Sequence, residues 1–202
     1  MMGVTIPYEL SGRVNQKART RDALIHATRT LLAEGAMPTM ESVAAAASIS
    51  RTTAYRYFPT LRALLVAAYP HFDEQSLLGP EPPDDPEARL QIVADDQTRR
   101  VLRYEQEMRT ALRLSLEGTR PPELPMHRGL RFKWIEDALA PLRGRMREDD
   151  LRGLIYGIGA TLGIEAFVWL TDVAGLEREE AAAIMCSNAS GLLRNALAAH
   201  GA

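Results

Sequence analysis

The sequence has little of what enzymes, metalloproteins and secreted proteins need. Its single cysteine, Cys186, excludes an internal disulfide bond and a zinc site built from several cysteines. His26, His71, His127 and His200 are scattered without metal-ligand spacing. The chain contains no His-Glu-x-x-His, no Gly-x-Ser-x-Gly and no Walker motif. We therefore expect no enzyme, no metal and no cofactor.

Signals for strands and for membrane segments are also scarce. There are no clean alternating runs and no Asn-Gly or Asp-Gly hairpin turns. The opening MMGVTIPYELSGRV has no apolar run long enough for a signal peptide. The most apolar segment, 151–170, is about one bilayer long but carries Arg152 and Glu165, so we expect a buried helix there. These features predict a cytoplasmic protein without a membrane span.

Helical periodicity, in contrast, recurs along the chain and predicts an all-α fold of about nine helices. Apolar residues make up 46 %, which is enough for a packed core without disulfides. Thr39, Ser50 and Thr60 are expected N-caps, and Pro86 is expected at the first position of the helix that follows Asp85. The expected helices cover 20–34, 40–47, 51–58, 61–75, 86–102, 104–117, 127–142, 149–173 and 178–199.

Charge divides the chain unevenly. Residues 1–65 hold eight Lys and Arg against four Asp and Glu, a net charge of +4, whereas the remainder has a net charge of −6. A basic first third on an acidic body is typical of a DNA-binding head with a separate regulatory body. Loops are expected at the Pro-rich segments 77–86 and 118–125. We expect a flexible N-terminal tail, a helix-turn-helix DNA-binding domain and a helical ligand-binding and dimerisation domain over 1–18, 19–65 and 66–202.

The segment ESVAAAASISRTTAYRYFPTLRALL, residues 41–65, carries the most specific pattern. Two short helices joined by a tight turn, the second capped by Ser50, make a helix-turn-helix. The alanines at 44–47 allow the two helices to cross closely. Val43, Ile49, Ala54 and Phe58 are expected to form a small core with the first helix.

The polar side of the third helix is the expected DNA-binding surface. Arg51, Thr52, Tyr55 and Arg56 can project as one exposed stripe into the major groove, where arginine bonds bidentately to guanine. Hydroxyls at the edges can contact phosphates. The alternative is that the arginines are solvated surface charges. The full expected set is Thr39, Ser50, Arg51, Thr52, Thr53, Tyr55, Arg56, Tyr57 and Arg62.

Residues 24–65, above all the Tyr-x-Tyr-Phe-Pro run, resemble the N-terminal DNA-binding domain of TetR-family transcriptional regulators. The resemblance implies an all-α homodimeric repressor whose C-terminal body binds a ligand that switches operator binding. Two positions depart from the family pattern. Ser48 stands where the family usually has glycine in the turn. Leu61 stands where it usually has a lysine that contacts phosphate, and Arg62 could replace that contact.

The basic N-terminal residues allow two interpretations. Arg13, Lys17, Arg19 and Arg21 could add contacts to phosphates or to the minor groove. The alternative is a disordered tail without a role in binding.

Small residues mark an expected dimer seam in the last two helices. Gly157-x-Gly159 is not read as a nucleotide loop, because no strand precedes it. The resemblance implies that these helices pair with their copies in a four-helix bundle; the alternative is packing within one chain. Four glycines in the helix at 149–173 also predict a bend. The expected seam residues are Gly153, Gly157, Ala160, Ile184, Ser187, Gly191 and Leu192.

Large adaptable side chains could line an apolar cavity for a small-molecule effector, although each could equally be simple core. Glu165, His127 and Arg131 are candidate polar handles, and Glu165 is either paired or available to a ligand because it interrupts an apolar run. The expected ligand-binding set is Tyr104, Met108, Leu112, Leu116, Trp134, Glu165, Phe167 and Trp169.

Together these features predict a ligand-responsive DNA-binding transcriptional regulator. We expect it to act as a repressor and to bind a palindromic operator as a homodimer, because two copies of a short recognition helix read far more sequence than one. The alternative is a helical protein-interaction module that does not bind DNA.

Overall fold

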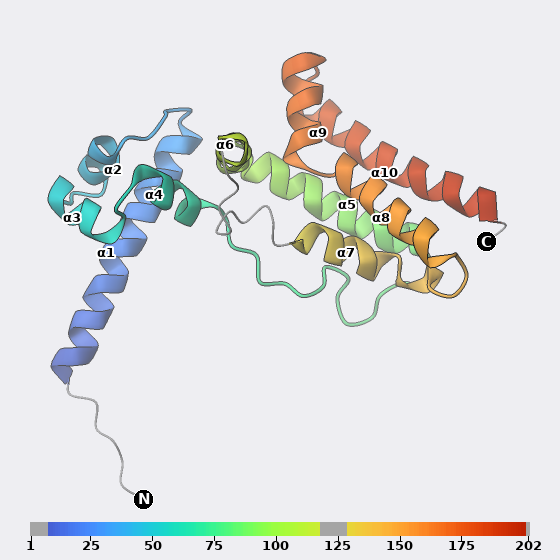
Figure 1. Ribbon diagram of the computed structural model, residues 1–202, viewed down its shortest axis with the longest axis horizontal. Coiled ribbons are helices and arrows are strands. Elements are labelled where there is room, and N and C mark those ends of the chain that lie inside the picture. The colour runs from blue at the N-terminus through green and yellow to red at the C-terminus, as the bar shows by residue number, and fades with distance from the viewer. Residues whose placement is uncertain (1–7, 118–128, 201–202) are drawn as a thin grey trace, which may run out of the picture. The chain divides into compact units, whose positions relative to one another are not determined.

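A computed structural model shows that the chain folds into two compact units, Met1–Pro70 and His71–Ala202 (Figure 1). It describes the backbone of residues 8–117 and 129–200 and the side chains of residues 15–117 and 129–199. Within these ranges the chain forms ten α-helices and no β-strand, which confirms the all-α prediction. The loop expected at 118–125 and the candidate handle His127 lie outside the described residues.

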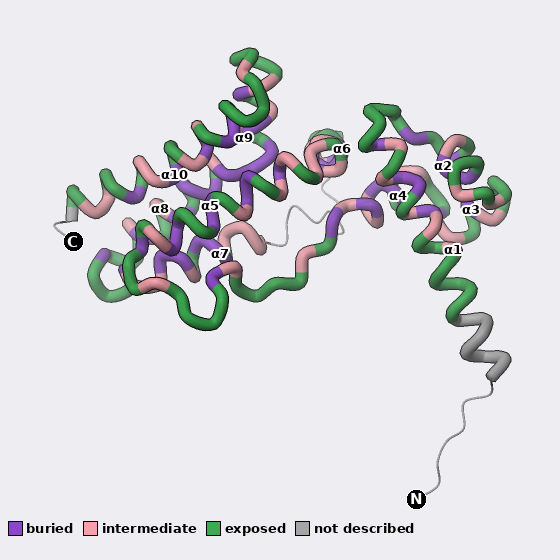
Figure 2. The backbone as a smooth tube through the Cα atoms, turned by 180° about the vertical axis from the view of Figure 1, so that it is seen from behind, coloured by how far each residue is buried: buried purple, intermediate pink, exposed green. Residues whose placement is uncertain are grey.

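The N-terminal unit contains four helices around one small core (Figure 2). Val43, Ala54 and Phe58 are buried in that core and Ile49 packs against it, as the sequence predicted. Leu24 and Ala27 from the first helix and Leu64 from the fourth complete it. The helices are α1 (Tyr8–Ala33), α2 (Met40–Ala46), α3 (Arg51–Tyr57) and α4 (Leu61–Ala68).

Two helices of this unit differ in length from the prediction. α1 begins at Tyr8, so residues 8–18, which we expected in a flexible tail, are helical. α4 ends at Ala68 and not near residue 75, because Pro70 disfavours helical geometry at the residue before it. Arg29 of α1 donates to the carbonyls of Ala68 and Tyr69 at 2.8 and 3.3 Å. These bonds tie the end of α4 to α1 within the first unit, which extends to Pro70.

The C-terminal unit is a bundle in which α10 packs against both α5 and α8. Asp85 caps α5 and accepts from the backbone of Glu87 and Ala88, with Pro86 at the first helical position, as predicted. The helices of this unit are α5 (Pro86–Arg103), α6 (Glu105–Leu116), α7 (Leu130–Ala138), α8 (Glu148–Thr161), α9 (Ile164–Val168) and α10 (Arg178–His200), with a short 3-10 turn (Ala140–Leu142) and a π-helical turn, η3 (Trp169–Val173).

The glycine-rich segment at 149–173 is bent, as predicted. α8 ends at Thr161, and the helical pair Glu148–Thr161 and Ile164–Val173 meets at 46°. A Cβ at Gly163 would lie 2.0 Å from both Arg131 Nη1 and Glu165 Oε2, so this ion pair covers the break directly. Among the described residues no single helix is long and apolar enough to cross a membrane. Only the two helices of the bent pair taken together reach the length and apolar composition of a membrane span.

The segment between α4 and α5 is fastened to the C-terminal unit by an aromatic and cationic cluster. The Phe72 ring lies edge-on to Tyr104 and Trp134, at 5.7 and 6.3 Å between centroids. The Arg100 guanidinium lies over Phe72 at 4.5 Å and over Trp134 at 5.1 Å. The Trp134 indole donates to the Glu74 carbonyl at 2.9 Å. Phe72 and Arg100 hold in place two aromatic residues that the sequence assigned to a ligand pocket.

Candidate nucleic-acid interface

The tight turn between α2 and α3 is built by local hydrogen bonds. The Ser48 and Ile49 amides donate to the carbonyls of Ala45 and Ala44 at 3.0 and 2.8 Å, the pattern of a Schellman motif. Ser48 occupies the left-handed position of this motif with φ 55°. The turn therefore keeps the geometry that usually requires glycine. Ser50 then caps α3 by accepting from the Thr53 amide at 3.1 Å.

The exposed stripe expected on α3 is present. Arg51, Thr52, Tyr55 and Arg56 are exposed, with Tyr55 39 % accessible, whereas Ala54 on the opposite side is fully buried. The spacing follows from 3.6 residues per turn, which brings positions 51, 52, 55 and 56 to one side of the helix. The stripe is thus held outward by a buried face that packs on α1 and α2.

Arg51 makes contacts that the sequence did not predict. Its guanidinium bonds to Glu41 of α2 at 2.8 Å and lies over the Tyr55 ring at 5.6 Å. Both partners of the ion pair are exposed, so the pair itself adds little stability. Its consequence is electrostatic, because Glu41 places a negative charge beside an expected DNA contact.

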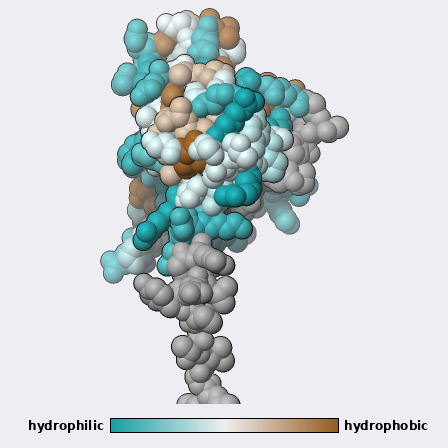
Figure 3. All heavy atoms as spheres, turned by 90° about the vertical axis from the view of Figure 1, so that its left-hand side faces the viewer, coloured by the Kyte–Doolittle hydropathy of each residue, from teal (hydrophilic) through white to brown (hydrophobic). Residues whose placement is uncertain are grey.

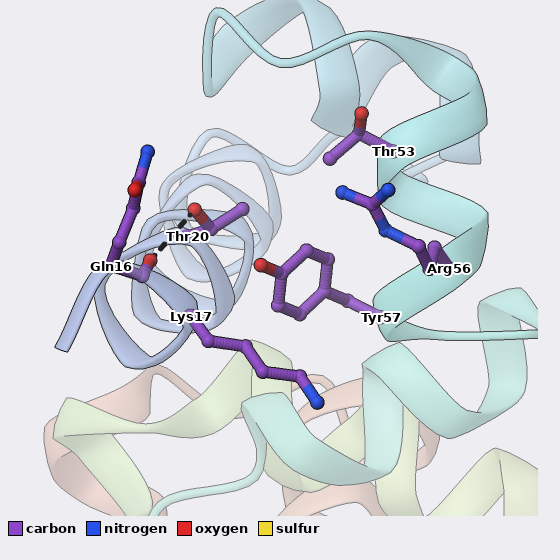
Figure 4. Close-up of a pocket in the computed structure, with 6 residues that line it drawn as sticks. All are labelled: Gln16, Lys17, Thr20, Thr53, Arg56 and Tyr57. Atoms are coloured by element: carbon purple, nitrogen blue, oxygen red, sulfur yellow. Dashed lines mark hydrogen bonds between the residues drawn. The ribbon is translucent and has the colours of Figure 1, made fainter. Parts of the chain in front are cut away.

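An open pocket of about 570 Å³ lies between α1 and α3 (Figure 4). Figure 4 shows the Tyr57 hydroxyl directed toward α1, with Arg56 on one side of the Tyr57 ring and the Lys17 side chain on the other. The Arg56 guanidinium lies 5.9 Å from the centre of the Tyr57 ring. On the α1 wall of this pocket the sequence had indicated Lys17, as one of four basic residues that could contact DNA, but not Gln16 or Thr20. Its lining residues are Gln16, Lys17, Thr20, Thr53, Arg56 and Tyr57.

The remaining expected contacts lie near the ends of α2 and α4. Thr39 is exposed and accepts from the Ser42 amide at 3.1 Å, so its hydroxyl caps α2. Leu61 is partly buried and packs against the core, which explains an apolar residue where the family usually has lysine. Arg62 beside it is half-buried. Seen from the side of this unit, the surface carries mostly hydrophilic and neutral residues with small hydrophobic areas between them (Figure 3).

The family model described as bacterial regulatory proteins, tetR family, matches residues 24–68. These residues are a TetR-family helix-turn-helix domain. The matched range contains α2, α3 with its exposed stripe, α4, and the C-terminal part of α1 from Leu24 onward. The protein is therefore a DNA-binding transcriptional regulator and not an enzyme, and the alternative of a helical module without DNA binding is set aside. No curated protein matches the chain.

The residues expected at the dimer seam lie on α8 and α10. Gly153, Ala160, Ser187 and Leu192 are exposed, and the other three are half-buried. A Cβ at Gly153 or Gly191 would meet no atom within 4 Å. At Gly157 it would lie 3.8 Å from Leu192, so the two helices pass each other at this point in one chain. The outer side of the crossing is left open.

The residues expected in the ligand pocket do not all lie together. Met108, Trp134 and Phe167 are buried, and Tyr104 and Leu112 are half-buried. In contrast, Leu116 and Trp169 are 77 % and 59 % exposed, because each lies near the end of its helix on the outer side. Glu165 is exposed and paired with Arg131 at 3.2 Å, which is one of the two outcomes expected for it.

The prediction from the sequence also missed a buried polar residue in this unit. Gln97 on α5 is 7 % exposed, and its side-chain nitrogen has no hydrogen-bond partner among the described residues. A buried donor without a partner costs about 1–3 kcal/mol. Its position in the helical pattern could have flagged it, because Val93, Gln97 and Val101 follow one another at intervals of four on the same side of the helix.

Proposed function

We propose that the protein is a ligand-responsive repressor that binds a palindromic operator as a homodimer. The exposed stripe of α3, Arg51, Thr52, Tyr55 and Arg56, is the observation that carries the DNA-binding part. In this proposal the stripe faces base edges in the major groove, and hydroxyls of Thr39, Ser50 and Thr53 contact phosphates beside it. Tyr57 and Arg62 contribute further backbone contacts.

The homodimer is proposed from the open side of α8 and α10. Gly153, Tyr156 and Ala160 form an exposed row of small and aromatic residues on α8, and Tyr156 is 57 % exposed. Small side chains allow a helix of a second copy to approach closely. A two-fold pair would present two α3 helices to one duplex, about 34 Å apart along the DNA axis.

The effector is proposed to bind within the helical ligand-binding and dimerisation domain, which we assign to residues 66–202. Met108, Trp134 and Phe167 supply buried apolar surface, and the unpartnered Gln97 amide supplies a donor. These groups favour a largely apolar molecule with at least one hydrogen-bond acceptor. Binding would shift the population toward a dimer whose two recognition helices no longer fit successive grooves. We place this regulator in the cytoplasm.

A gel-shift titration over a range of salt concentrations tests the proposal. Arg56→Ala should weaken binding to duplex DNA and lower the salt dependence while the dimer persists. Arg99→Ala is the matched control, because Arg99 is an exposed arginine of α5. Equal binding of duplex DNA by the wild type and Arg56→Ala would show that α3 does not form the DNA interface.

A further inference from the structure

The pocket between α1 and α3, here called the α1–α3 pocket, has the chemistry of an anion site (Figure 4). Lys17 and Arg56 give its lining a formal charge of +2, and the lining contains no acidic residue. Neither cation forms an ion pair with another described residue. The remaining lining residues are three hydroxyl-bearing side chains and one amide, all of which are able to form hydrogen bonds.

The hydrogen bonds already made inside the pocket show which donors remain available. The Thr20 hydroxyl donates to the Gln16 carbonyl at 3.0 Å, so Thr20 shapes the wall without donating to a ligand. The Thr53 oxygen accepts from the Ser50 hydroxyl at 2.9 Å, which leaves the Thr53 proton free. Lys17, Arg56, Tyr57 and Thr53 all line the same pocket and can each donate to an oxyanion bound there, and charge-assisted bonds from cations are the strong ones.

We propose that the α1–α3 pocket holds a phosphate of the DNA backbone at the edge of the groove that α3 enters. This inference rests on the proposed function, because it requires α3 to lie in the major groove. A groove about 12 Å wide has phosphates along both edges, so a helix that faces the bases has a phosphate row beside it. Arg56 lies on the exposed stripe and also lines the pocket, which places the pocket directly at that edge.

The α1 wall of the α1–α3 pocket lies outside the residues that the family model matches. The family match begins at residue 24, whereas Gln16, Lys17 and Thr20 precede it on the same continuous helix. Leu61 packs against the core and provides no charge at the start of α4. Lys17 supplies a positive charge to the same unit from a different helix. The N-terminal turns of α1 thus become part of the DNA-binding surface.

The test compares two cations of α1 that differ in position. Lys17 lines the pocket, and Arg19, also exposed, does not. Full-length wild type, Lys17→Ala, Lys17→Arg and Arg19→Ala are titrated onto a fluorescent duplex selected from a random pool by the wild type, at several salt concentrations. Lys17→Ala should bind roughly three- to tenfold more weakly and lower the salt slope by about 0.9, as for one lost phosphate contact. Lys17→Arg should restore both values.

A second arm locates the phosphate and identifies its source. Single phosphates of the duplex are replaced by neutral methylphosphonates; one replacement should weaken the wild type while leaving Lys17→Ala unchanged. Inorganic phosphate and a mononucleotide are added at constant ionic strength, at concentrations that do not disturb nonspecific binding of the protein to DNA. Neither should compete with the selected duplex for the protein. The proposal would be overturned if the free anions bind in a way that depends on Lys17 while Lys17→Ala keeps the duplex affinity of the wild type. The pocket would then be a site for a free anion.

Equal losses in Lys17→Ala and Arg19→Ala would also overturn it, because they would show a diffuse electrostatic effect without a defined pocket. Failure of the wild type to bind any duplex would instead contradict the proposed function itself. Circular dichroism melts of the variants check folding. Lys17 and Arg19 are both exposed, so we expect the melting curves of the variants to superimpose on that of the wild type.

Discussion

At the scale of single residues, Ser48 is the clearest case of local strain. It has φ 55° after α2, and Gly35 has φ 74° at the same position after α1, with the same two backbone hydrogen bonds. A left-handed conformation costs a non-glycine residue roughly 1–2 kcal/mol, which is partly offset by the flexibility glycine adds to the unfolded chain. Ser48→Gly should therefore stabilise the protein by about 0.5–1 kcal/mol.

Urea denaturation of the full chain, followed by circular dichroism, measures this effect. Ser48→Val is the matched control, because a β-branched residue tolerates positive φ least. It should lower the denaturation midpoint. A stabilising Val or a destabilising Gly would show that the turn is not left-handed in solution.

The ion pair between Arg51 and Glu41 gives a second prediction at this scale. Glu41 neutralises an expected DNA contact from 2.8 Å away. Glu41→Gln should free Arg51 and remove a negative charge from the interface, so we expect duplex affinity to rise by roughly two- to fivefold at low salt. Fluorescence anisotropy checks this value. Unchanged affinity would mean that Arg51 lies away from the DNA.

Residue-scale features were predictable where their causes are local. Thr39, Ser50 and Thr60 were predicted as caps and are caps, because a cap depends on residues within one turn. The Arg51–Glu41 pair was not predicted, because it depends on how α2 crosses α3.

At the scale of elements, helical periodicity predicted that α1 and α4 exist but not where each of them begins or ends. The start of α1 was missed because residues 8–19 have no clear apolar face, so nothing in the pattern distinguishes a polar helix from a tail. The end of α4 was missed although Pro70 marks it, because the prediction continued the helix through the proline to residue 75. The bend near Gly163 was predicted from glycine content alone.

The contact between α6 and η3 gives a prediction about pH. Arg109 bonds to both carboxylate oxygens of Asp172, at 2.6 and 2.7 Å, and lowers the pKa of Asp172. A carboxyl with a lower pKa in the folded state stabilises the fold above its unfolded pKa of about 3.9, and this stabilisation is lost as the pH falls through the folded pKa. Because Asp172 is 49 % exposed, we expect at most about 1 kcal/mol.

Asp172→Asn should therefore lower the melting temperature at neutral pH, and the difference from the wild type should close below about pH 4. Thermal melts over a pH series measure it. Asp149→Asn is the control, because its pair with Arg152 is exposed on both sides and should contribute little. A difference that persists unchanged into acid would assign the effect to something other than this charge.

At the scale of the whole molecule, the glycines of α8 distinguish packing within one chain from packing between two copies. A Cβ at Gly159 would lie 2.5 Å from the Phe132 ring, whereas one at Gly153 would meet nothing within 4 Å. Gly159→Ala should destabilise the fold by about 1–3 kcal/mol. Gly153→Leu should leave folding intact but dissociate the proposed dimer.

Sedimentation velocity and thermal melts together test this pair of variants. A monomeric wild type, or a Gly153→Leu variant that remains fully dimeric, would contradict the proposed seam. A melting temperature of Gly159→Ala equal to that of the wild type would contradict the Phe132 contact.

The sequence predicted the DNA-binding site better than the effector site for a physical reason. A recognition helix is set by caps, a turn and one buried face within about twenty residues, all of which are visible in the pattern. A pocket depends on which helices cross, so periodicity alone could not place Trp169 and Leu116 outside it. Gln16 and Thr20 in the α1 wall of the α1–α3 pocket were missed for the same reason.

The central claim is that the exposed stripe of α3 contacts duplex DNA and that a symmetric pair presents it twice. Selection of duplexes from a random pool by the full-length protein, followed by sequencing, tests it most directly. The account predicts inverted repeats whose half-site centres are about one helical turn, roughly 34 Å, apart, and loss of the enriched bases in a Thr52→Ala, Arg56→Ala double variant. An unenriched pool, or a single motif without a symmetric partner, would contradict it.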